Sequence, residues 1–422
     1  MKRIVVLGGA GDMAGVACRR LAELRKDVHM VLADRQVERA RQRALSLGPA
    51  FSAHAVDILD PQGLRQLVSG ASLVVNAAGP YSVLGRPALQ AAMDCRADYI
   101  DFSDESEAAE SMLELHRDAQ EAGITALIGA GVAPGLVNVL VRYLNGLLDE
   151  ADGAQVAWVT GASPRQPGQL GDGRAVIEHM LHSCIGKTFT VRNGQRQPIA
   201  AFRHSEVLPF PEPLGDCRVY DIGHSELVTV PRSFPGMTRV RCQGAIQPAA
   251  LNGLFQGLAR AVERERITFN AALDCLMDLE RGVTPRFKPA LAALGGILRQ
   301  WLRGELRARD LTALMRLMRD DAEQHHAGGL YIRVEGRLRG RRAAWVSRAA
   351  SLQTADQGGM DEVTGTPLAC FAHLMLDGKI RQPGVHAPEA IVDPRLLHQL
   401  FSQVGGHPGI APLFEPELQW LQ

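Results

Sequence analysis

A glycine-rich turn near the start of the chain has the residue types and spacing best suited to bind a phosphate group. It occupies residues 8–14 (Gly-Gly-Ala-Gly-Asp-Met-Ala), between the apolar run Ile4–Leu7 and an amphipathic segment. In such a strand–turn–helix unit, Gly9 permits the tight turn and Gly11 lets the backbone approach a pyrophosphate. The free N–H groups at the start of the helix attract the same anion. We therefore predict a dinucleotide site that includes four residues of this turn: Gly9, Gly11, Asp12 and Met13.

An acidic residue after the next apolar run supports the same prediction. Asp34 follows residues 28–32 and lies 23 residues after Gly11, where an acid can accept hydrogen bonds from a ribose diol. Asp34 would repel a 2′-phosphate and favours NAD, whereas Arg35 could bind that phosphate and keeps NADP open. The alternatives are a solvated acid or helix N-cap at Asp34 and an ordinary surface residue at Arg35. The expected cofactor is NAD or NADP.

Strands and helices alternate through the first 130 residues. Apolar runs predict strands at residues 4–7, 28–32, 51–56, 73–77, 98–102 and 124–128, and the segments between them include predicted helices at 61–69, 87–95 and 105–122. This order is typical of a doubly wound parallel sheet of the Rossmann type, in an α/β fold. Ligands of such sheets bind beyond the carboxyl ends of the strands.

The ends of the third and fourth predicted strands extend the expected cofactor site. Small residues at 77–79 would let the backbone pass close to the ribose and nicotinamide, although tight strand–helix packing could also explain them. An acid at 57 could meet the adenine edge or serve only as a turn residue. These positions complete the predicted cofactor contacts: Asp57, Ala77, Ala78, Gly79 and Pro80. Tyr81 would border the nicotinamide and the substrate, or would be an aromatic residue at the rim with no role.

Composition and charge exclude several classes of protein. The 422 residues carry 46 basic and 46 acidic side chains, so no general attraction to nucleic acid is expected. Seven cysteines are scattered without a C-x-x-C pair, which argues against a disulfide framework and favours a reducing cytoplasm. The histidines show no metal-ligand spacing, so no metal site is expected. No apolar run approaches the roughly 18 residues of a membrane span, and the first is too short for a signal peptide.

A different region begins after residues 129–135 (Gly-Ala-Gly-Val-Ala-Pro-Gly). Short strands and many glycines and prolines follow, then mostly helical sequence over 251–326. Residues 290–306 and 311–318 alternate apolar and basic side chains, which could touch a membrane surface. Packing of the apolar residues with a solvated arginine face is the favoured interpretation. Residues 331–334 and 341–346 then resemble paired strands with a turn near Gly336, and a helix is predicted from Pro367.

Five motifs resemble those of one known family. They are residues 74–81 (Val-Val-Asn-Ala-Ala-Gly-Pro-Tyr), 99–105 (Tyr-Ile-Asp-Phe-Ser-Asp-Glu), 131–138 (Gly-Val-Ala-Pro-Gly-Leu-Val-Asn), 364–367 (Thr-Gly-Thr-Pro) and 384–389 (Gly-Val-His-Ala-Pro-Glu). Together they resemble the saccharopine dehydrogenase (saccharopine reductase-like) family of NAD(P)-dependent oxidoreductases. The resemblance extends over nearly the whole chain and is strongest in residues 1–140.

This resemblance implies a domain organisation and a reaction. It implies a Rossmann domain at 1–132, a second α+β domain with a mixed sheet for substrate binding and dimerisation at 133–360, and a C-terminal segment at 361–422 that returns to the Rossmann domain. It also implies a homodimer and hydride transfer at the carbon–nitrogen bond of a small, amino-acid-derived substrate.

Chemistry at an imine requires a proton donor near the nitrogen and cations for any substrate carboxylates. Tyr99, Asp101 and Glu105 follow the fifth predicted strand, on the correct edge of the sheet, and are the predicted catalytic residues. Asp101 and Glu105 could hold an iminium cation or relay a proton, whereas residues 103–107 could also simply cap a helix. Arg232, in what we predict to be a rigid loop, is the first choice for a substrate carboxylate. The other candidate arginines are Arg174, Arg239 and Arg241.

Two other functions remain open from the residues. The first is a C=C reductase of lipid or polyketide tailoring, in which the helices of 251–318 would wall a long apolar pocket. The second is a non-catalytic nucleotide-binding scaffold, which would bind the cofactor but have no substrate cleft.

Overall fold

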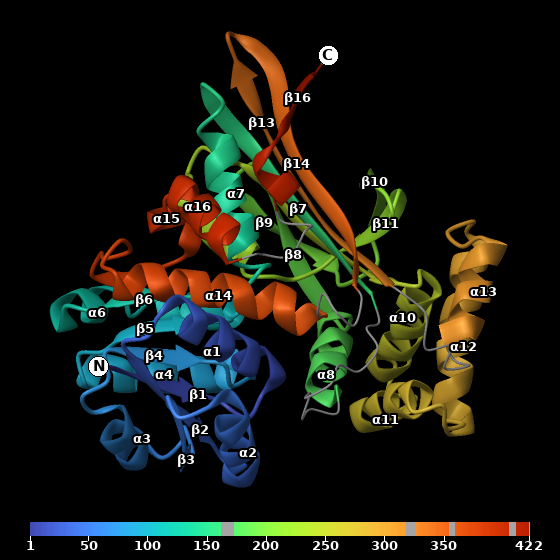
Figure 1. Ribbon diagram of the computed structural model, residues 1–422. Helices are drawn as coiled ribbons and strands as arrows, with labels where there is room; N and C mark the ends of the chain where they lie inside the picture. Colours follow the sequence, from blue (N-terminus) through green and yellow to red (C-terminus); the bar gives the residue numbers. More distant parts are fainter. Residues whose placement is uncertain (162–172, 318–325, 354–358, 405–410, 422) are drawn as a thin grey trace.

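Two β-sheets organise the computed structural model, each covered by helices (Figure 1). The structure describes residues 1–161, 173–317, 326–353, 359–404 and 411–421. No helix in these ranges is long and apolar enough to cross a membrane.

The N-terminal sheet has seven strands, all parallel, in the order β15-β6-β5-β4-β1-β2-β3. Its strands are β1 (Lys2–Leu7), β2 (Val28–Asp34), β3 (Phe51–Ala55), β4 (Leu73–Asn76), β5 (Asp98–Asp101), β6 (Thr125–Leu127) and β15 (Gly384–His386). The order reverses between β1 and β4, as in a doubly wound fold, so the predicted Rossmann-type sheet is confirmed. Side chains of β1 are buried on both faces of the sheet, which explains its unbroken apolar run.

Helices flank both faces of this sheet (Figure 1). They are α1 (Asp12–Leu24), α2 (Val37–Leu47), α3 (Pro61–Val68), α4 (Tyr81–Asp94), α5 (Ser106–Leu113) and α6 (His116–Ala122). The predicted start of a helix at Pro87 is wrong, because α4 begins at Tyr81 and contains that proline. The carboxylate of Glu105, in the loop after β5, accepts hydrogen bonds from the first N–H groups of α4. The single helix predicted over 105–122 is divided into α5 and α6.

The second domain has a mixed sheet of nine strands. Its strands are β7 (Glu150–Gly161), β8 (Lys187–Arg192), β9 (Gln195–Ala200), β10 (Ser205–Pro209), β11 (Asp216–Asp221), β12 (Arg239–Gln247), β13 (His326–Leu338), β14 (Arg341–Gln353) and β16 (Glu417–Trp420). The β7–β12 pair is parallel, and the other pairs are antiparallel. The α+β second domain with a mixed sheet is therefore confirmed.

The β13–β14 hairpin turns at Arg339 and Gly340, which have φ of 52° and 74°. The turn predicted near Gly336 is therefore misplaced. Gly336 lies inside the strand, where a Cβ atom would be 1.8 Å from the carbonyl oxygen of Glu150 on β7. This glycine serves close strand pairing and not chain reversal.

Most of the helices described in the second domain belong to one group, α10–α13. The helices of this domain are α7 (Leu136–Asn145), α8 (Arg174–Ser183), α9 (Glu226–Ser233), α10 (Ala250–Glu263), α11 (Phe269–Glu280), α12 (Phe287–Leu302) and α13 (Ala308–Leu317). The group α10–α13 lies beside the ends of β7, β13 and β14, at the far side of the molecule from α3 (Figure 1). Met318, the last residue of one predicted apolar–basic segment, falls outside the described residues.

The C-terminal segment divides between the two domains. Helix α14 (Met360–Leu376) packs on α1, and β15 extends the N-terminal sheet beside β6. Then α15 (Pro388–Ile391), α16 (Pro394–Gln403) and a 3-10 helix at Ala411–Phe414 lead to β16, which pairs with β14 of the second sheet. The predicted return to the first domain thus applies to α14 and β15. Helix α14 also begins seven residues before Pro367, which it contains.

Candidate active site

A cavity of about 2520 Å³ opens at the carboxyl edge of the parallel sheet, where the two domains meet. The first domain lines it with the glycine turn and the ends of β2 and β4. The second domain lines it with α8 and the loop before α9, and residues of α10, α11 and α13 extend it. Ligand sites are common in such clefts between domains and at this edge of an α/β sheet.

The glycine turn has the shape that the sequence predicts, with one change of role. Gly8 supplies the left-handed conformation, with φ of 75°, and a Cβ there would lie 2.8 Å from the Ala77 backbone. Gly9 does not line the cavity; its Cβ would lie 2.7 Å from the side chain of Leu32. Gly8 therefore makes the turn, and Gly9 allows β1 and β2 to approach.

The start of α1 is open toward the cavity. Gly11, its N-cap, makes no side-chain cap, and Gly11, Asp12 and Met13 all line the cavity. The nearest atom to a Cβ at Gly11 would be the Gly8 carbonyl oxygen at 3.2 Å. Uncapped N–H groups at the start of a 13-residue helix fit a pyrophosphate, which would supply the missing acceptors. The Asp12 carboxylate is turned to Arg43, with which it forms an ion pair.

Asp34 ties the end of β2 to the glycine turn. One carboxylate oxygen accepts a hydrogen bond from the Ala10 N–H at 3.2 Å, and the other accepts from Gln36 N–H at 2.9 Å. Arg35 and Arg39 line the same part of the cavity, so both signs of charge lie where the ribose of a dinucleotide would bind. Asp57 also lines the cavity and accepts a hydrogen bond from the Leu59 N–H at 3.0 Å, as its turn role predicts.

Small residues after β4 form the adjoining wall. Five consecutive positions line the cavity: Ala77, Ala78, Gly79, Pro80 and Tyr81. Below them, buried Asn76 accepts a hydrogen bond from the Ala78 N–H at 3.1 Å and donates one to the Tyr99 hydroxyl at 3.1 Å. The buried amide of Asn76 therefore fixes the chain where it leaves the sheet.

Two of the three predicted catalytic residues lie beneath the cavity and do not line it. Asp101 is completely buried and accepts hydrogen bonds from Gly129 N–H at 2.7 Å, Ser103 N–H at 3.0 Å and the Tyr99 hydroxyl at 2.9 Å. Burial raises the pKa of Asp101 to about 6 in spite of these donors. Asp101 and Tyr99 thus join the end of β5 to the loop that leads into the second domain.

The third predicted catalytic residue, Glu105, does line the cavity, and its carboxylate has a structural task. It accepts hydrogen bonds from the N–H groups of Tyr81 at 2.8 Å and Ser82 at 2.9 Å. Glu105 therefore caps α4 from across the sheet edge, a different helix from the one its sequence position suggested. It also fixes Tyr81 against the cavity.

A chain of carboxylates and imidazoles crosses from the first domain to the second. Asp104 lies 3.0 Å from Nε2 of His179, on α8, and 3.8 Å from Nε2 of His224. Nδ1 of His224 lies 2.6 Å from the Glu226 carboxylate. Hydrogen bonds from Ser225 N–H to the Asp104 carbonyl and from the Ser106 hydroxyl to the His224 carbonyl, both 2.9 Å, hold the two loops together.

These contacts shift the ionisation of the whole group. The Asp104 carboxylate raises the pKa of His179 to about 9. Burial opposes charge on Asp104, but His179 and His224 outweigh it and lower its pKa to about 2. Burial likewise opposes charge on His224, and the Glu226 and Asp104 carboxylates outweigh it and raise its pKa. At neutral pH, His179 is therefore a positively charged imidazolium beside the Asp104 carboxylate. Both residues line the same cavity as the expected cofactor site.

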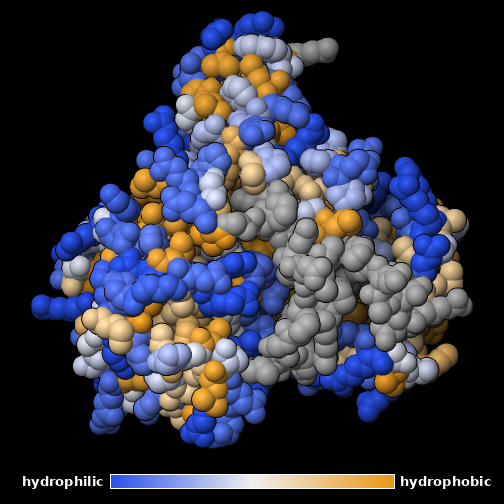
Figure 2. Space-filling model, viewed as in Figure 1, coloured by the Kyte–Doolittle hydropathy of each residue, from blue (hydrophilic) through white to orange (hydrophobic). Residues whose placement is uncertain are grey.

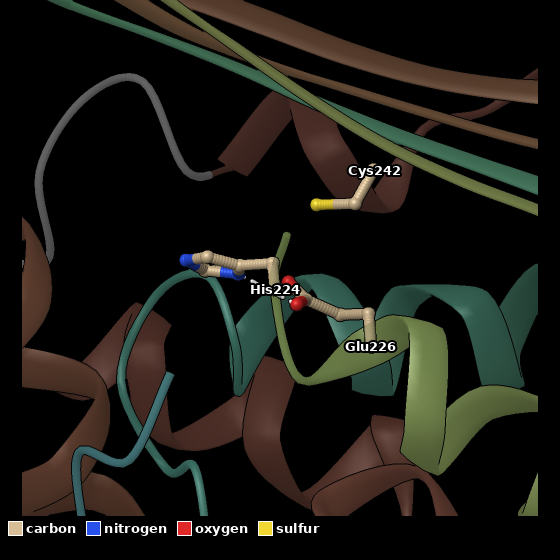
Figure 3. A group of neighbouring side chains, drawn as sticks. All are labelled: His224, Glu226 and Cys242. Atoms are coloured by element: carbon tan, nitrogen blue, oxygen red, sulfur yellow. Dashed lines mark hydrogen bonds and ion pairs between the residues drawn. The ribbon is translucent and has the colours of Figure 1, made fainter. Parts of the chain in front are cut away.

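Figure 3 shows that Cys242, on β12, faces the buried His224–Glu226 pair. Their ligand atoms lie within 4.8 Å of one another, so the three could surround a metal ion, as could Asp104, Glu105 and His179. In the structure, however, His224 and Glu226 use these atoms to bind each other, and burial keeps the pKa of the Cys242 thiol well above its usual value. His224 and one oxygen of Glu226 thus form a buried ion pair, and the other carboxylate oxygen of Glu226 is buried without a hydrogen-bond partner among the described residues.

The sequence did not indicate this group. The sequence favours helix capping for Asp104, and the spacing of the histidines indicates only that they do not form a metal-ligand motif. They lie at positions 179 and 224, on a helix and a loop that only tertiary folding brings to Asp104. An acid directly after a strand end of a parallel sheet was the one available signal.

The predicted carboxylate-binding arginine lies elsewhere. Arg232 is exposed in the last turn of α9 and does not line the cavity, so the prediction of a rigid loop is wrong. Arg239 pairs with Asp152 and Glu335, and Arg241 pairs with Glu206 and Asp221. Of the four arginines considered, Arg174, on α8 five residues before His179, is the one that lines the cavity.

One arm of the cavity is apolar. It is lined by side chains of α10, α11 and α13 and of neighbouring strands: Ile246, Leu251, Leu254, Phe255, Phe269, Leu276, Leu279, Leu314, Leu317 and Leu330. The arm has the character predicted for a C=C reductase with a long apolar pocket. It continues from the part of the cavity that α8 lines.

Comparisons with known proteins find similarity to one family model in the first domain. Residues 4–127 match the family model described as "Saccharopine dehydrogenase NADP binding domain". The chain is 25% identical over 259 residues to carboxyaminopropylagmatine dehydrogenase of Synechocystis sp., covering 59% of this chain and 64% of the relative. It is 26% identical over 152 residues to a trans-acting enoyl reductase of Mycobacterium bovis, covering 35% and 36%. The chain thus matches less than two thirds of each relative.

A solved structure matches over the full length. The apo saccharopine dehydrogenase (L-Glu forming) of Saccharomyces cerevisiae has a TM-score of 0.64 and 16% sequence identity, with both chains covered completely. At this identity the match concerns the fold, which both chains share from the parallel sheet through the mixed sheet.

Proposed function

Since residues 4–127 form an NAD(P)-binding domain of the saccharopine dehydrogenase type, we propose that the whole chain is an oxidoreductase of that kind. It would act at the carbon–nitrogen bond of a small, amino-acid-derived substrate. The observation that carries this proposal is the Asp104–His179 ion pair, which lies in the same cavity as the glycine turn. An imidazolium beside a nicotinamide site is suited to reactions that move a hydride and a proton together.

In the proposed reaction, the carbon of an imine gains a hydride and its nitrogen gains a proton as the C=N double bond becomes a single bond. A bound nicotinamide would supply or accept the hydride. Residues 77–79 have small side chains, which leave room for the ring, and Glu105 holds Tyr81 against the same space. His179 donates the proton to nitrogen in the direction of reduction, and the Asp104 carboxylate holds its imidazolium in place.

A carboxylate-bearing substrate needs a cation in the same cavity. We assign this role to Arg174, which lies on α8 five residues before His179 and lines the cavity. It also forms ion pairs with Glu178, at 4.0 Å, and with Asp274, at 3.7 Å. Arginine can bind a carboxylate through two parallel hydrogen bonds, which would orient the substrate relative to His179.

The test uses the purified chain in two steps. Fluorescence titration with NADH and NADPH measures cofactor binding, and NAD(P)H absorbance is then followed with oxo acids or aldehydes in the presence and absence of amines. We expect oxidation of NAD(P)H only when a carbonyl compound and an amine are both present. Cofactor binding without turnover of any such pair would favour the non-catalytic scaffold, and absence of binding would contradict the proposal altogether.

A second candidate function is reduction of a C=C bond in an apolar substrate. The specific observation in its favour is the apolar arm lined by α10, α11 and α13, whose apolar side chains suit an alkyl or acyl chain. An enoyl thioester of medium chain length, assayed with the same cofactors, distinguishes the two. Turnover of the enoyl compound alone would favour this candidate.

We also propose a cytoplasmic location and a homodimer formed through residues 133–360. All seven cysteines are free, and six are buried, which supports a reducing compartment. The homodimer is supported by the family resemblance. Sedimentation velocity of the purified chain tests it, since a single species of monomer mass across micromolar concentrations would contradict it.

A further inference from the structure

Helix α12 is apolar on two opposite faces. Its inner face buries Pro289, Ala293, Gly296, Ile297 and Gln300. Its outer face exposes six large apolar side chains: Phe287 (79%), Leu291 (58%), Leu294 (60%), Leu298 (57%), Trp301 (42%) and Leu302 (76%). A helix that is apolar all round is normally covered on all sides, whereas the described residues leave the outer face of α12 exposed.

The exposed residues form a continuous stripe. Residues 287, 291, 294, 298 and 301 follow one another at intervals of four and three, which places them along one side of the helix. On the face that Figure 2 shows, by contrast, hydrophobic surface over the N-terminal domain is interspersed with hydrophilic surface. The sequence favoured a solvated arginine face on this segment, and the structure instead turns a leucine stripe outward.

Close backbone packing holds α12 in this orientation. A Cβ at Gly296 would lie 1.9 Å from the Gly253 carbonyl oxygen, and one at Gly257 would lie 2.2 Å from that of Ala292. Glycines on α10 and α12 therefore let the two backbones touch, and any rotation of α12 that buried the leucines would place side chains in this contact. Helix α12 lies at the edge of the molecule, away from the two sheets (Figure 1).

Basic side chains border the stripe. Lys288, Arg299 and Arg303 recur along one flank of α12, and Arg260, Arg264 and Arg266 lie at the neighbouring end of α10. Among the described residues, none of these six has an ion pair; nearby Arg203 binds Glu263 at 3.1 Å. Burial and the neighbouring arginines lower the pKa of Arg260 to about 10, against the opposite effect of Glu263, and also lower the pKa of Arg299.

An apolar stripe bordered by a cluster of basic side chains fits one kind of partner best. An anionic bilayer offers acyl chains to the leucines and phosphate groups to the arginines. A second copy of the chain in an antiparallel two-fold contact would bring the same flank of each α12 together, so arginines would face arginines. We propose that α12, with its flanking arginines, docks the protein on the surface of an anionic phospholipid membrane.

The geometry specifies how the helix would lie. At 16 residues α12 is too short to span a bilayer, so it would lie in the plane of the interface with its stripe toward the acyl chains. Trp301 would then sit near the headgroups at one end of the stripe, a depth that tryptophan prefers. The apolar arm of the cavity lies behind α10, so the docked face and the active site are on neighbouring sides of the same helical group.

The test is co-sedimentation of the full chain with vesicles of phosphatidylcholine alone or with 30% phosphatidylglycerol. We expect binding to the anionic vesicles, weaker binding to the neutral ones, and release by high salt. A blue shift of tryptophan fluorescence that disappears in Trp301→Phe would place α12 at the interface. Binding by the charged headgroups alone would leave this fluorescence unchanged and would contradict docking through the stripe.

Two variants separate the apolar and the charged contributions. Leu294→Ser with Leu298→Ser, and Arg299→Gln with Arg303→Gln, should each weaken partitioning by about tenfold or more. Matched controls are Leu45→Ser and Arg41→Gln on exposed positions of α2, which should bind like the unchanged protein. Circular dichroism should show that all four variants keep their fold, because the substituted side chains lie mainly at the surface.

Self-association is the competing occupant of the stripe, and sedimentation velocity without vesicles measures it. If the leucine variant turned a dimer into a monomer while no form of the protein bound vesicles, α12 would be a self-interface and the proposal would be overturned. The assays are independent of catalysis, so vesicle binding can hold or fail whether or not a carbon–nitrogen substrate is found.

Discussion

The two walls of the cavity differ in how they are built. The first is the carboxyl edge of the parallel sheet, where the residues after β1, β2 and β4 meet because parallel strands end side by side. The second consists of α8 and the loop before α9, which reach Asp104 from positions 179 and 224. The first wall is set by strand order, and the second is set by how two domains pack.

Asp101 and Asp104 show the same contrast within one loop. Asp101 faces inward and accepts three hydrogen bonds from the protein, so its task is structural. Asp104, three residues later, faces the cavity and binds an imidazolium of the second domain. Sequence proximity to a strand end therefore identified the right loop but not the right carboxylate.

The largest effect should come from the second wall. In the proposed reaction, His179→Gln removes the proton donor while keeping a polar side chain, and we expect a loss in kcat of about 10²- to 10⁴-fold with little change in cofactor affinity. His182→Gln, on the same helix and also lining the cavity, is the matched control and should retain activity. Steady-state kinetics with the most active pair of carbonyl compound and amine measure kcat for both variants. Equal losses of kcat in the two variants would show that His179 is not the proton donor.

In the first wall, two glycine substitutions should separate an effect on folding stability from an effect on cofactor binding. Gly8→Ala places a Cβ 2.8 Å from the Ala77 backbone at a φ of 75°, and should cost about 1–3 kcal/mol or more of unfolding free energy. Gly11→Ala meets only the Gly8 carbonyl oxygen at 3.2 Å, so it should cost less stability and mainly weaken cofactor binding. Urea denaturation and cofactor titration measure the two effects. If both variants lowered the unfolding free energy equally, Gly11 would not have a role specific to cofactor binding.

Glu105 tests whether the first wall depends on a cap made across the sheet edge. Glu105→Ala leaves the N–H groups of Tyr81 and Ser82 without their acceptors and should cost about 0.5–2 kcal/mol. Glu107→Ala, on the exposed first turn of α5, should have almost no effect. If thermal unfolding failed to separate the two variants, the carboxylate would not be a cap.

The pH dependence of stability distinguishes Asp101 from Asp104. The pKa of Asp101 is raised to about 6 in the fold, so its contribution is fully present below about pH 4 and is lost as the pH rises through 6. Glu389, with a pKa raised to about 7, acts in the same direction, whereas Asp104, lowered to about 2, loses its contribution only as the pH falls. Asp101→Asn should therefore flatten the fall in stability between pH 4 and 6, as measured by urea denaturation. An unchanged slope would show that Asp101 titrates normally.

The smallest effect is expected at Arg232. This side chain is exposed at the end of α9 and outside the cavity, so Arg232→Gln should change stability by less than about 0.5 kcal/mol and leave kcat/KM unchanged. Arg174→Gln is the contrasting variant and should raise KM for a carboxylate substrate. A loss of affinity in Arg232→Gln instead would return the carboxylate site to the sequence-based choice.

The sequence by itself determined the Rossmann-type sheet, the glycine turn, the acid at the end of β2 and the small residues after β4. These follow from local chemistry, because apolar runs, glycines and strand ends act over a few residues and parallel strands place their ends together. Tertiary structure alone decided which acid meets His179, which helix Glu105 caps, and which face of α12 is left uncovered. Each of these depends on contacts between segments far apart in the chain, for which the sequence has no period or spacing.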